Sequence, residues 1–275
     1  MLPKATIKSR RNKLELKPRT ADTDIYAEYL LCLALDVGEG MLKNGSEISR
    51  VEDTIERICK AYGAAHIEVF SIISFISAAI RMPDGSYSSQ LRRIKSTGTN
   101  LNILEKLNAL SREICATTPS LEVFDKKIRD LKKMPPYPIY VRIAASSAAV
   151  GGFALFFGGN LLDTLIAMFI GAIICLIDIY APTRLSSMAK TVISSFIATL
   201  IAGLSLKMGL NSNPDYIIIG SIMILVPGLA FGTALRDLLC GDLLSGSLKT
   251  LQACLGALMI AFGYMLGSAL LGGPV

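Results

Sequence analysis

The apolar second half of the chain constrains its fold more than any other feature. Five apolar stretches follow one another after residue 137, at 139–157, 162–180, 188–207, 216–235 and 248–271. Each is close to the roughly 20 residues that a helix needs to cross the hydrocarbon core of a bilayer. Backbone polar groups inside hydrocarbon must be satisfied within the segment itself, which favours helices. The pattern therefore predicts an all-α polytopic membrane domain of five transmembrane helices over residues 138–275.

Charge divides the chain at the same place. Residues 1–137 hold 22 of the 28 Lys and Arg and 17 of the 22 Asp and Glu. The basic segment 1–21 is expected to be a disordered N-terminus, because it is polar and lacks an apolar periodicity. Residues 22–137 are predicted to form a cytoplasmic α+β domain. The expected fold class is therefore mixed, with an N-terminal soluble α+β domain followed by the membrane domain.

Local patterns between residues 22 and 137 predict helices and a small sheet. Ser49 and Glu52 have the spacing of a capping box, which places a helix start there. Residues 66–81 are rich in Ile, Val and Phe and predict one or two strands, with a hairpin partner at 87–94. Helical spacing predicts further helices at 26–41, 100–115 and 121–133. A proline-rich run at 134–138 ends helical structure and marks the boundary between the domains.

Several function classes lack their sequence signals. The basic clusters come without an aromatic-interleaved or zinc motif, so no nucleic-acid partner is expected, and a juxtamembrane position explains them better. The six cysteines form no C-x-x-C pair, and the single histidine, His66, is expected at the surface or at a strand edge. No cofactor, metal site or catalytic residue is expected. The chain has no Walker A loop, so any transport within it is passive or driven by an ion gradient.

The fourth apolar stretch interrupts itself. Pro227 and Gly228 fall near its middle, and Arg236, Asp237 and Asp242 follow at its end. Proline removes a backbone donor, and carbonyl groups freed in lipid need a partner. The break is explained either by a packing kink or by a discontinuous helix whose ends line a polar path.

Ionisable residues at membrane depth are candidates for function. Arg236 and Asp237 could form a local ion pair or a cytoplasmic gate. Asp178 and Arg184 form a second carboxylate–guanidinium set near the end of the second stretch, although Asp178 could simply be hydrated at the interface. Loop charges favour a cytoplasmic N-terminus and a C-terminus outside the cytoplasm.

Small residues recur every fourth position in the apolar stretches, which permits close approach of helix backbones and predicts a multi-helix bundle with a partner subunit. These sets are Ala144, Ala148 and Gly152; Ser194, Ala198 and Ala202; Gly228 and Gly232; and Gly263 and Gly267.

Two motifs resemble the threonine/serine exporter family. The first is LKNGSEISRVEDTIERICKAYG, in which Gly45, Arg50 and Glu52 hold motif positions, and the second is LVPGLAFGTALRDLLCGDLLSG. On the residues alone, Arg50 and Glu52 are better explained by a solvated helix face and a cap. This chain has Thr233 where the family often has Asn, so an amide-specific substrate contact is not expected.

The resemblance implies a subunit of a bacterial inner-membrane exporter, similar to the larger, YjjP-like subunit. Its expected partners are a second small membrane subunit, the lipid bilayer and a small carboxylate metabolite, either a threonine- or serine-type amino acid or a dicarboxylate such as succinate, in a homo- or hetero-oligomer. The substrate-path residues implied are Pro227, Gly228, Thr233, Arg236, Asp237, Asp242, Asp178 and Arg184. Two alternatives stay open, a hydrolase-like soluble domain and a scaffold without transport of its own.

Overall fold

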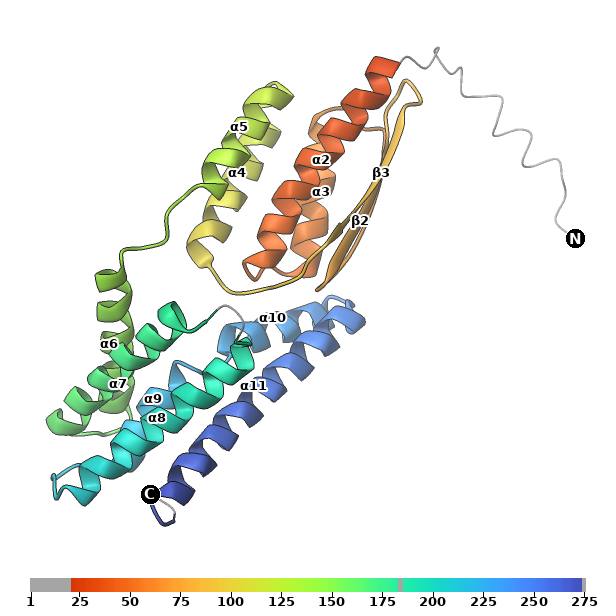
Figure 1. Ribbon diagram of the computed structural model, residues 1–275. Helices are drawn as coiled ribbons and strands as arrows, with labels where there is room; N and C mark the ends of the chain where they lie inside the picture. Colours follow the sequence, from red (N-terminus) through yellow and green to blue (C-terminus); the bar gives the residue numbers. More distant parts are fainter. Residues whose placement is uncertain (1–20, 183–184, 274–275) are drawn as a thin grey trace, which may run out of the picture. The chain divides into compact units, whose positions relative to one another are not determined.

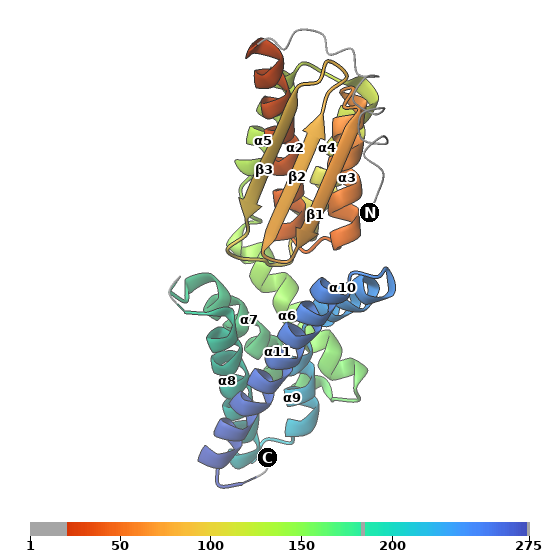
Figure 2. The same cartoon turned by 90° about the vertical axis from the view of Figure 1, so that its right-hand side faces the viewer.

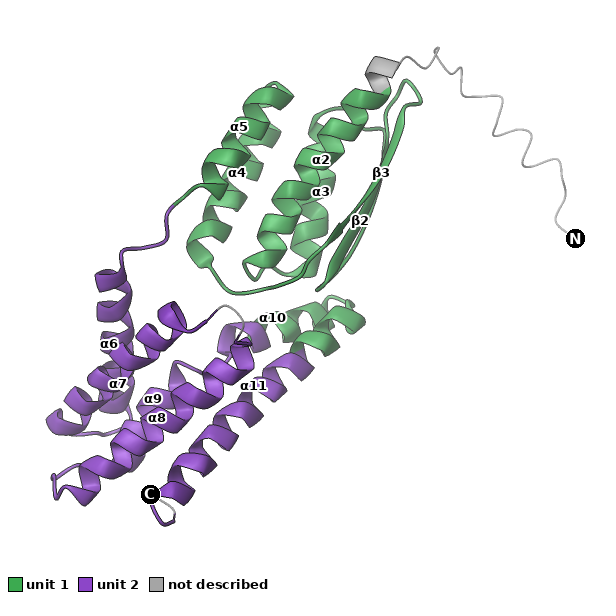
Figure 3. Ribbon diagram, viewed as in Figure 1, with its two compact units in different colours: residues 1–134, 232–249 green, residues 135–231, 250–275 purple. Residues whose placement is uncertain are grey.

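The computed structural model describes residues 21–182 and 185–273. Arg184 and the predicted disordered N-terminus lie outside these residues, except that Ala21 already belongs to the first described helix. The chain divides into two compact units (Figure 3): Met1–Met134 with Gly232–Lys249, and Pro135–Phe231 with Thr250–Val275. The segment Gly232–Lys249 therefore belongs with the N-terminal part of the chain, although its sequence continues the apolar half.

Over the described residues 21–134, the first unit forms an antiparallel sheet and four helices, here called the α+β region. Along the chain the elements are α2 (Ala21–Lys43), α3 (Ile48–Ala61), β1 (His66–Ile72), β2 (Phe75–Arg81), β3 (Tyr87–Arg93), α4 (Leu101–Thr117) and α5 (Leu121–Lys132) (Figure 1). The strands pair in the order β1-β2-β3, with His66 opposite Arg81 and Phe75 opposite Arg93. The predicted strands and hairpin are confirmed, and His66 is exposed on an edge strand as expected.

Helices cover one face of this sheet in two layers. Helices α2 and α3 pack on the strands, and α4 and α5 pack on those helices from the far side (Figure 2). Between the layers lie fully buried side chains such as Leu35, Ile55, Ile80 and Phe124. Each contributes about 1.5–3 kcal/mol by leaving water. On the exposed face of α3, Asp53 and Arg57 form an ion pair with a carboxylate–guanidinium distance of 2.8 Å.

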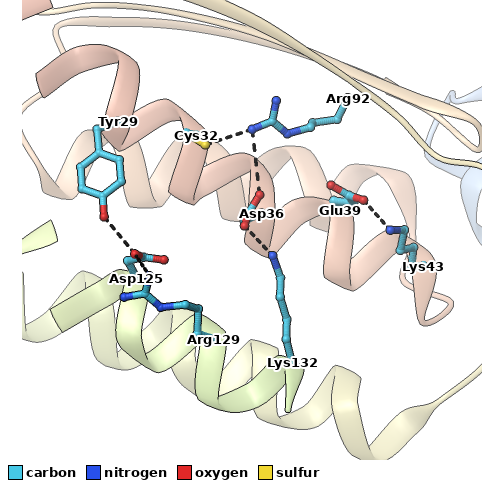
Figure 4. A network of polar contacts seen from close by, with 9 residues as sticks. All are labelled: Tyr29, Cys32, Asp36, Glu39, Lys43, Arg92, Asp125, Arg129 and Lys132. Carbon is cyan, nitrogen blue, oxygen red and sulfur yellow. Dashed lines mark hydrogen bonds and ion pairs between the residues drawn. The ribbon is translucent and has the colours of Figure 1, made fainter. Parts of the chain in front are cut away.

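Polar contacts tie α2 to its neighbours around the edge of this core (Figure 4). The Tyr29 hydroxyl donates to Asp125 of α5 at 3.0 Å, and Lys132 of the same helix pairs with Asp36 at 2.5 Å. Arg92 of β3 donates to the Cys32 sulfur at 3.0 Å from the opposite side. These contacts fix the register of α2 against both α5 and the sheet.

The predicted capping box at Ser49 and Glu52 is wrong. Helix α3 starts at Ile48, its N-cap residue is Glu47, and no side chain of the cap residue bonds to the helix. Glu52 instead accepts hydrogen bonds from the backbone N–H and the hydroxyl of Ser71 in β1, at 2.6 and 3.0 Å. The packing of α3 on the sheet therefore takes the carboxylate away from the helix start.

The apolar half is helical. Its elements are α6 (Ile139–Phe156), α7 (Leu161–Tyr180), α8 (Ser187–Lys207), α9 (Pro214–Met223), α10 (Gly228–Leu239) and α11 (Leu243–Leu270). Among the described residues, α6, α7, α8 and α11 are long and apolar enough to cross a membrane, and the bent pair α9 and α10 makes a fifth if it counts as one span. The predicted five transmembrane helices are therefore found as four continuous helices and, at the fourth stretch, a broken pair where Pro227 and Gly228 predicted an interruption. Helix α11 also begins five residues before the predicted 248, directly after a turn.

Close backbone approaches organise the second unit. A Cβ atom placed on Gly220 of α9 would lie 2.7 Å from the backbone nitrogen of Ala154 in α6, and one on Gly263 of α11 would lie 2.5 Å from the Val192 carbonyl oxygen of α8. The Ser195 hydroxyl of α8 donates to the Ile260 carbonyl of α11 at 2.8 Å. The predicted set Gly263 and Gly267 of α11 therefore lies at a tight contact with α8. The predicted α8 set, Ser194, Ala198 and Ala202, is buried, but the α8 atoms nearest to these two glycines belong to other residues.

The other two small-residue sets are not packed in this way. Ala144, Ala148 and Gly152 are exposed on α6, and a Cβ atom on Gly152, Gly228 or Gly232 would meet no described heavy atom within 4 Å. The four-residue spacing predicted the packing of half of these sets.

Candidate functional site

The interruption predicted at Pro227 and Gly228 is confirmed. Helix α9 ends at Met223, α10 starts at Gly228, and the two are bent by 51°. The intervening residues form turns, in which the N–H groups of Leu225 and Val226 donate to the Ile222 carbonyl at 2.8 and 3.1 Å. Proline has no N–H to continue the helical ladder, so α10 starts afresh after it.

A glycine turn then folds the chain back into α11. Gly241 has φ +96°, a left-handed conformation that glycine adopts without penalty. The Asp242 N–H donates to the Asp237 carbonyl at 2.9 Å, and the Gly241 N–H donates to the Leu238 carbonyl at 3.2 Å. This pair of bonds is a Schellman motif, which satisfies the last carbonyls of α10. The segment Gly232–Lys249, called the hairpin below, is thereby closed at its tip.

A second Schellman motif lies on the facing part of the same unit. Gly45 has φ +92°, the Ser46 N–H donates to the Met41 carbonyl at 3.1 Å, and the Gly45 N–H donates to the Leu42 carbonyl at 3.3 Å. This turn ends α2 and leads within three residues to the start of α3. The motif glycine Gly45 therefore has a backbone role, since it sets the loop Gly45–Glu47.

The hairpin and this loop meet at a buried ion pair. Asp237 of α10 is fully buried, and its Oδ2 atom lies 2.6 Å from the Nζ atom of Lys249 in α11, which is 8% exposed. Asp237 Oδ1 accepts the backbone N–H of Ile48 at 3.2 Å, and Lys249 Nζ donates to the Ser46 carbonyl at 3.3 Å. Buried charges of this kind need both a partner and further hydrogen bonds, and the loop supplies the latter.

An exposed ion pair lies beside the buried one. Arg236 donates to Glu47, the N-cap residue of α3, at 2.9 Å, and the arginine side chain is 60% exposed. The expectation of a local ion pair between Arg236 and Asp237 is therefore wrong. The two residues point to different partners because neighbours on a helix lie about 100° apart.

Two further carboxylates lie in this neighbourhood. Burial raises the pKa of Glu52 above its ordinary value, and the charge of Asp242 raises it further, against the hydrogen bonds from Ser71. Burial also raises the pKa of Asp242, the nearby Asp237 charge adds to that effect, and Lys249 opposes it. The remaining motif residue, Arg50, is exposed on the first turn of α3.

Asp178 lies in the second unit with two cations. Its carboxylate is 3.0 Å from the guanidinium of Arg142 and 3.8 Å from the ammonium of Lys190, and the same lysine donates to the Asp178 carbonyl at 3.1 Å. The carboxylate is largely exposed. This arrangement joins the ends of α6, α7 and α8.

Lys249, Ser46 and Glu47 were missed as site residues. Lys249 had a usable signal, because it is the one charged residue inside the last predicted apolar stretch. Nothing local distinguishes Ser46, which enters the site through its carbonyl oxygen. Its hydroxyl is buried without a hydrogen-bond partner among the described residues.

Four apolar helices of bilayer length and a broken pair define a multi-pass membrane protein. The chain belongs to the threonine/serine exporter (ThrE) family, whose model matches residues 32–271, which makes it a member of a family of membrane exporters. The resemblance seen in the two motifs is thereby confirmed. They are the two segments that supply the loop and the hairpin.

Curated relatives extend over most of the chain. It is 28% identical over 248 residues to the threonine/serine exporter of Corynebacterium glutamicum, a match that covers 86% of this chain and 50% of that protein. It is 23% identical over 230 residues to the protein named "Probable succinate transporter subunit YjjP" of Klebsiella aerogenes, covering 80% of this chain and 88% of that protein. The chain thus spans half the length of the Corynebacterium exporter and most of the YjjP subunit. No solved structure matches it.

Proposed function

We propose that this chain is one subunit of an exporter of small carboxylate-bearing metabolites, such as threonine- or serine-type amino acids or dicarboxylates, and that the transport is not driven by ATP. The single observation that carries the proposal is the broken span α9–α10 in a chain of an exporter family. Transporters use interrupted helices to bring backbone polar groups to membrane depth, where they contact substrate.

The chemistry of the break suits a carboxylate. Helix α10 begins at Gly228 with the N–H end of its dipole, which favours negative charge. Neither Pro227 nor Gly228 carries a bulky polar side chain, so the backbone itself is the recognition surface. Thr233 lies five residues, or about one and a half turns, further along α10. Arg236, Asp237 and Asp242 form the inner mouth in this proposal. Asp178, held by Arg142 and Lys190, is proposed as a gating carboxylate. Arg184 remains a proposed substrate-path residue and lies outside the described residues.

A second membrane subunit completes the transporter in this proposal. The Corynebacterium exporter is twice as long as the matched region, whereas the YjjP subunit is nearly matched from end to end. A chain with one block of four helices and a broken pair corresponds to one half of the longer protein. The exposed small-residue face of α6 and the apolar surfaces of the other helices are then shared between lipid and that partner.

Charge placement supports a bacterial inner-membrane location with the N-terminus in the cytoplasm. If the five spans alternate in direction, most of the charged span ends lie on the same side of the membrane as the N-terminus, namely those with Arg142, Lys190, Arg236 and Lys249. Lys207 lies at a span end on the opposite side. The positive-inside rule places the first group in the cytoplasm. Residues 22–137 are then a soluble cytoplasmic domain, and the five-span reading of 138–275 counts α9 and α10 as one span.

Export from loaded cells tests the proposal. Cells lacking their own exporters of the substrate are loaded with threonine or with succinate, and efflux is measured with this chain alone, with its partner subunit, and with neither. Pro227→Ala restores a backbone donor and is expected to lower export about tenfold or more, since catalytic and transport geometry is lost with small displacements. Pro214→Ala is the matched control, because Pro214 holds the first position of α9, where the missing N–H breaks no helical bond.

Three outcomes decide the proposal. Export that requires both chains and falls in the Pro227 variant supports it. Equal efflux with and without this chain means that it is a scaffold or has another role. A Pro227 variant that inserts normally and exports like the Pro214 control removes the break from the substrate path.

A further inference from the structure

Helix α3 starts without a capping side chain of its own. Its N-cap residue, Glu47, makes no side-chain bond to the helix, and its first N–H group, that of Ile48, donates to Asp237. The first N–H groups of a helix have no intrahelical acceptor and lie at the positive end of its dipole. The carboxylate of Asp237, 189 residues away in the sequence, therefore accepts a hydrogen bond at the helix start, where most helices use a neighbouring Ser or Asp as the cap.

Lys249 completes the same contact from the other arm of the hairpin. It neutralises Asp237 at 2.6 Å and also donates to the Ser46 carbonyl, one residue before the N-cap. Both charges are buried, so each depends on the other. Neither group is satisfied by the hairpin alone.

Two explanations for this pair differ in what the loop contributes. If the pair only closed the hairpin, the backbone of Ser46 and Ile48 would be incidental to it. The two atoms of the Asp237 carboxylate instead divide their bonds, with Oδ2 facing Lys249 and Oδ1 facing the α3 backbone. The contact joins three elements, namely the loop before α3, α10 and α11.

We infer that Asp237 and Lys249 are positioning residues that dock the hairpin on the start of α3, and that export depends on this docking because it sets the inner half of the broken span. The inference rests on the proposed function for its consequence in transport. Its structural part rests on the contacts among the four residues that meet at the ion pair, Ser46, Ile48, Asp237 and Lys249. Through this contact, a conformational change in the α+β region would alter the positions of α10 and α11, although these helices are far from α3 in the sequence.

Hydrogen exchange on the full-length protein in lipid nanodiscs measures the docking directly. In Lys249→Met and in Asp237→Ala, the amides of residues 46–52 are expected to exchange about tenfold faster or more, because removing one partner leaves a buried charge unpaired and frees the start of α3. Amides of the sheet and of α5 are expected to exchange at the parental rate. Lys60→Met is the matched control, since Lys60 pairs with Glu56 on the exposed face of the same helix.

A double variant separates positioning from general destabilisation. Asp237→Asn combined with Lys249→Met removes both charges but keeps an oxygen that can accept the Ile48 N–H. Its protection at 46–52 is expected to return to within about threefold of the parental protein, although each charge is gone, because groups in contact are strongly non-additive. A general packing defect would instead make the double variant worse than Lys249→Met alone.

Export gives the second readout. In Lys249→Met the maximal export rate is expected to fall about tenfold or more while the internal substrate concentration for half-maximal export changes little, since Lys249 would act through α10 and not on substrate. If Lys249→Met and Lys60→Met exchange alike at 46–52, or export alike, the inference is overturned. If the parental chain with its partner exports nothing, the proposed function fails, and the exchange measurements still judge the docking.

Discussion

One of the close approaches between two spans in the second unit lies at Gly220 of α9. This glycine is buried against Ala154 of α6, and a Cβ atom added to it would lie 2.7 Å from the Ala154 nitrogen and 2.9 Å from its Cα and Cβ atoms. Non-bonded carbon atoms are at their best separation at about 3.5–4.0 Å. Gly220→Ala therefore forces α9 and α6 apart by several tenths of an ångström.

The magnitude follows from a comparison of two glycines. Gly152 lies on α6 in open space, with no described heavy atom within 4 Å of an added Cβ. Glycine-to-alanine replacement in a helix gains about 1 kcal/mol of helix propensity at either site. Gly220→Ala adds an overpacking cost of about 1–3 kcal/mol, because two of the atoms it meets belong to the backbone. The helix-propensity gain is the same in both variants and cancels. Their free energies of unfolding are thus expected to differ by about 1–3 kcal/mol.

Heating the purified protein in one detergent measures this difference. The fraction that stays monodisperse on size-exclusion chromatography is followed at one heating rate, since membrane proteins rarely unfold reversibly. At about 2–4 °C per kcal/mol, Gly220→Ala should lose monodispersity roughly 2–12 °C below Gly152→Ala. Adding Ala154→Gly should recover only part of the loss, because the backbone atoms remain. Equal midpoints for the two single variants would show that α6 and α9 do not approach closely, and would refute the packing described here.

Burial raises the pKa of Glu52 from its ordinary 4.5, so the carboxyl group binds its proton more tightly in the folded protein than in the unfolded chain. The folded protein therefore loses stability as pH rises through the raised pKa. Glu52→Gln mimics the protonated form, so its thermal stability relative to the parental chain should increase as pH rises from about 4.5, and this gain should persist above the raised pKa. A stability difference between the two proteins that stays constant from about pH 4 to 7.5 would contradict this. Asp163 is 1% exposed and accepts two loop N–H groups, so Asp163→Ala should cost about 2–4 kcal/mol while Asp215→Ala, at an exposed first-turn position, costs far less in the same heating assay. Burial raises the pKa of the Cys59 thiol to about 12, so in the folded protein at pH 8 maleimide should label exposed Cys240 readily and leave Cys59 unmodified, as mass spectrometry of the peptides would show.

Local periodicity predicted the elements of this chain well. Helical spacing located α4 and α5 to within two residues at each end, and the strand predicted at 87–94 is β3. The apolar stretches located α6, α7 and α8 in the same way. All these elements depend on residues three or four apart in a helix, or two apart in a strand, so a single sequence contains the information.

Contacts between distant segments were not predictable in the same way. Glu52 has the spacing of a helix cap, yet its carboxylate bonds to Ser71, because the packing of α3 on β1 decides where the side chain points. A local ion pair was one of two alternatives for the adjacent residues Arg236 and Asp237, yet the helix turns them toward Glu47 and Lys249. In each case the residue makes a polar side-chain contact, and the fold determines its partner.

The site also explains why two motifs so far apart occur in one chain. A carboxylate and an ammonium such as Asp237 and Lys249 are costly in a helix that borders hydrocarbon, and several kcal/mol are lost if either is left alone. The hairpin on its own leaves Oδ1 of Asp237 without the Ile48 N–H, and α3 on its own leaves that N–H without an acceptor. Gly45 turns the loop toward the hairpin, and Gly241 brings Lys249 back beside Asp237. Both glycines shape the chain at the place where the two segments meet, so the first motif and the second are two sides of a single contact.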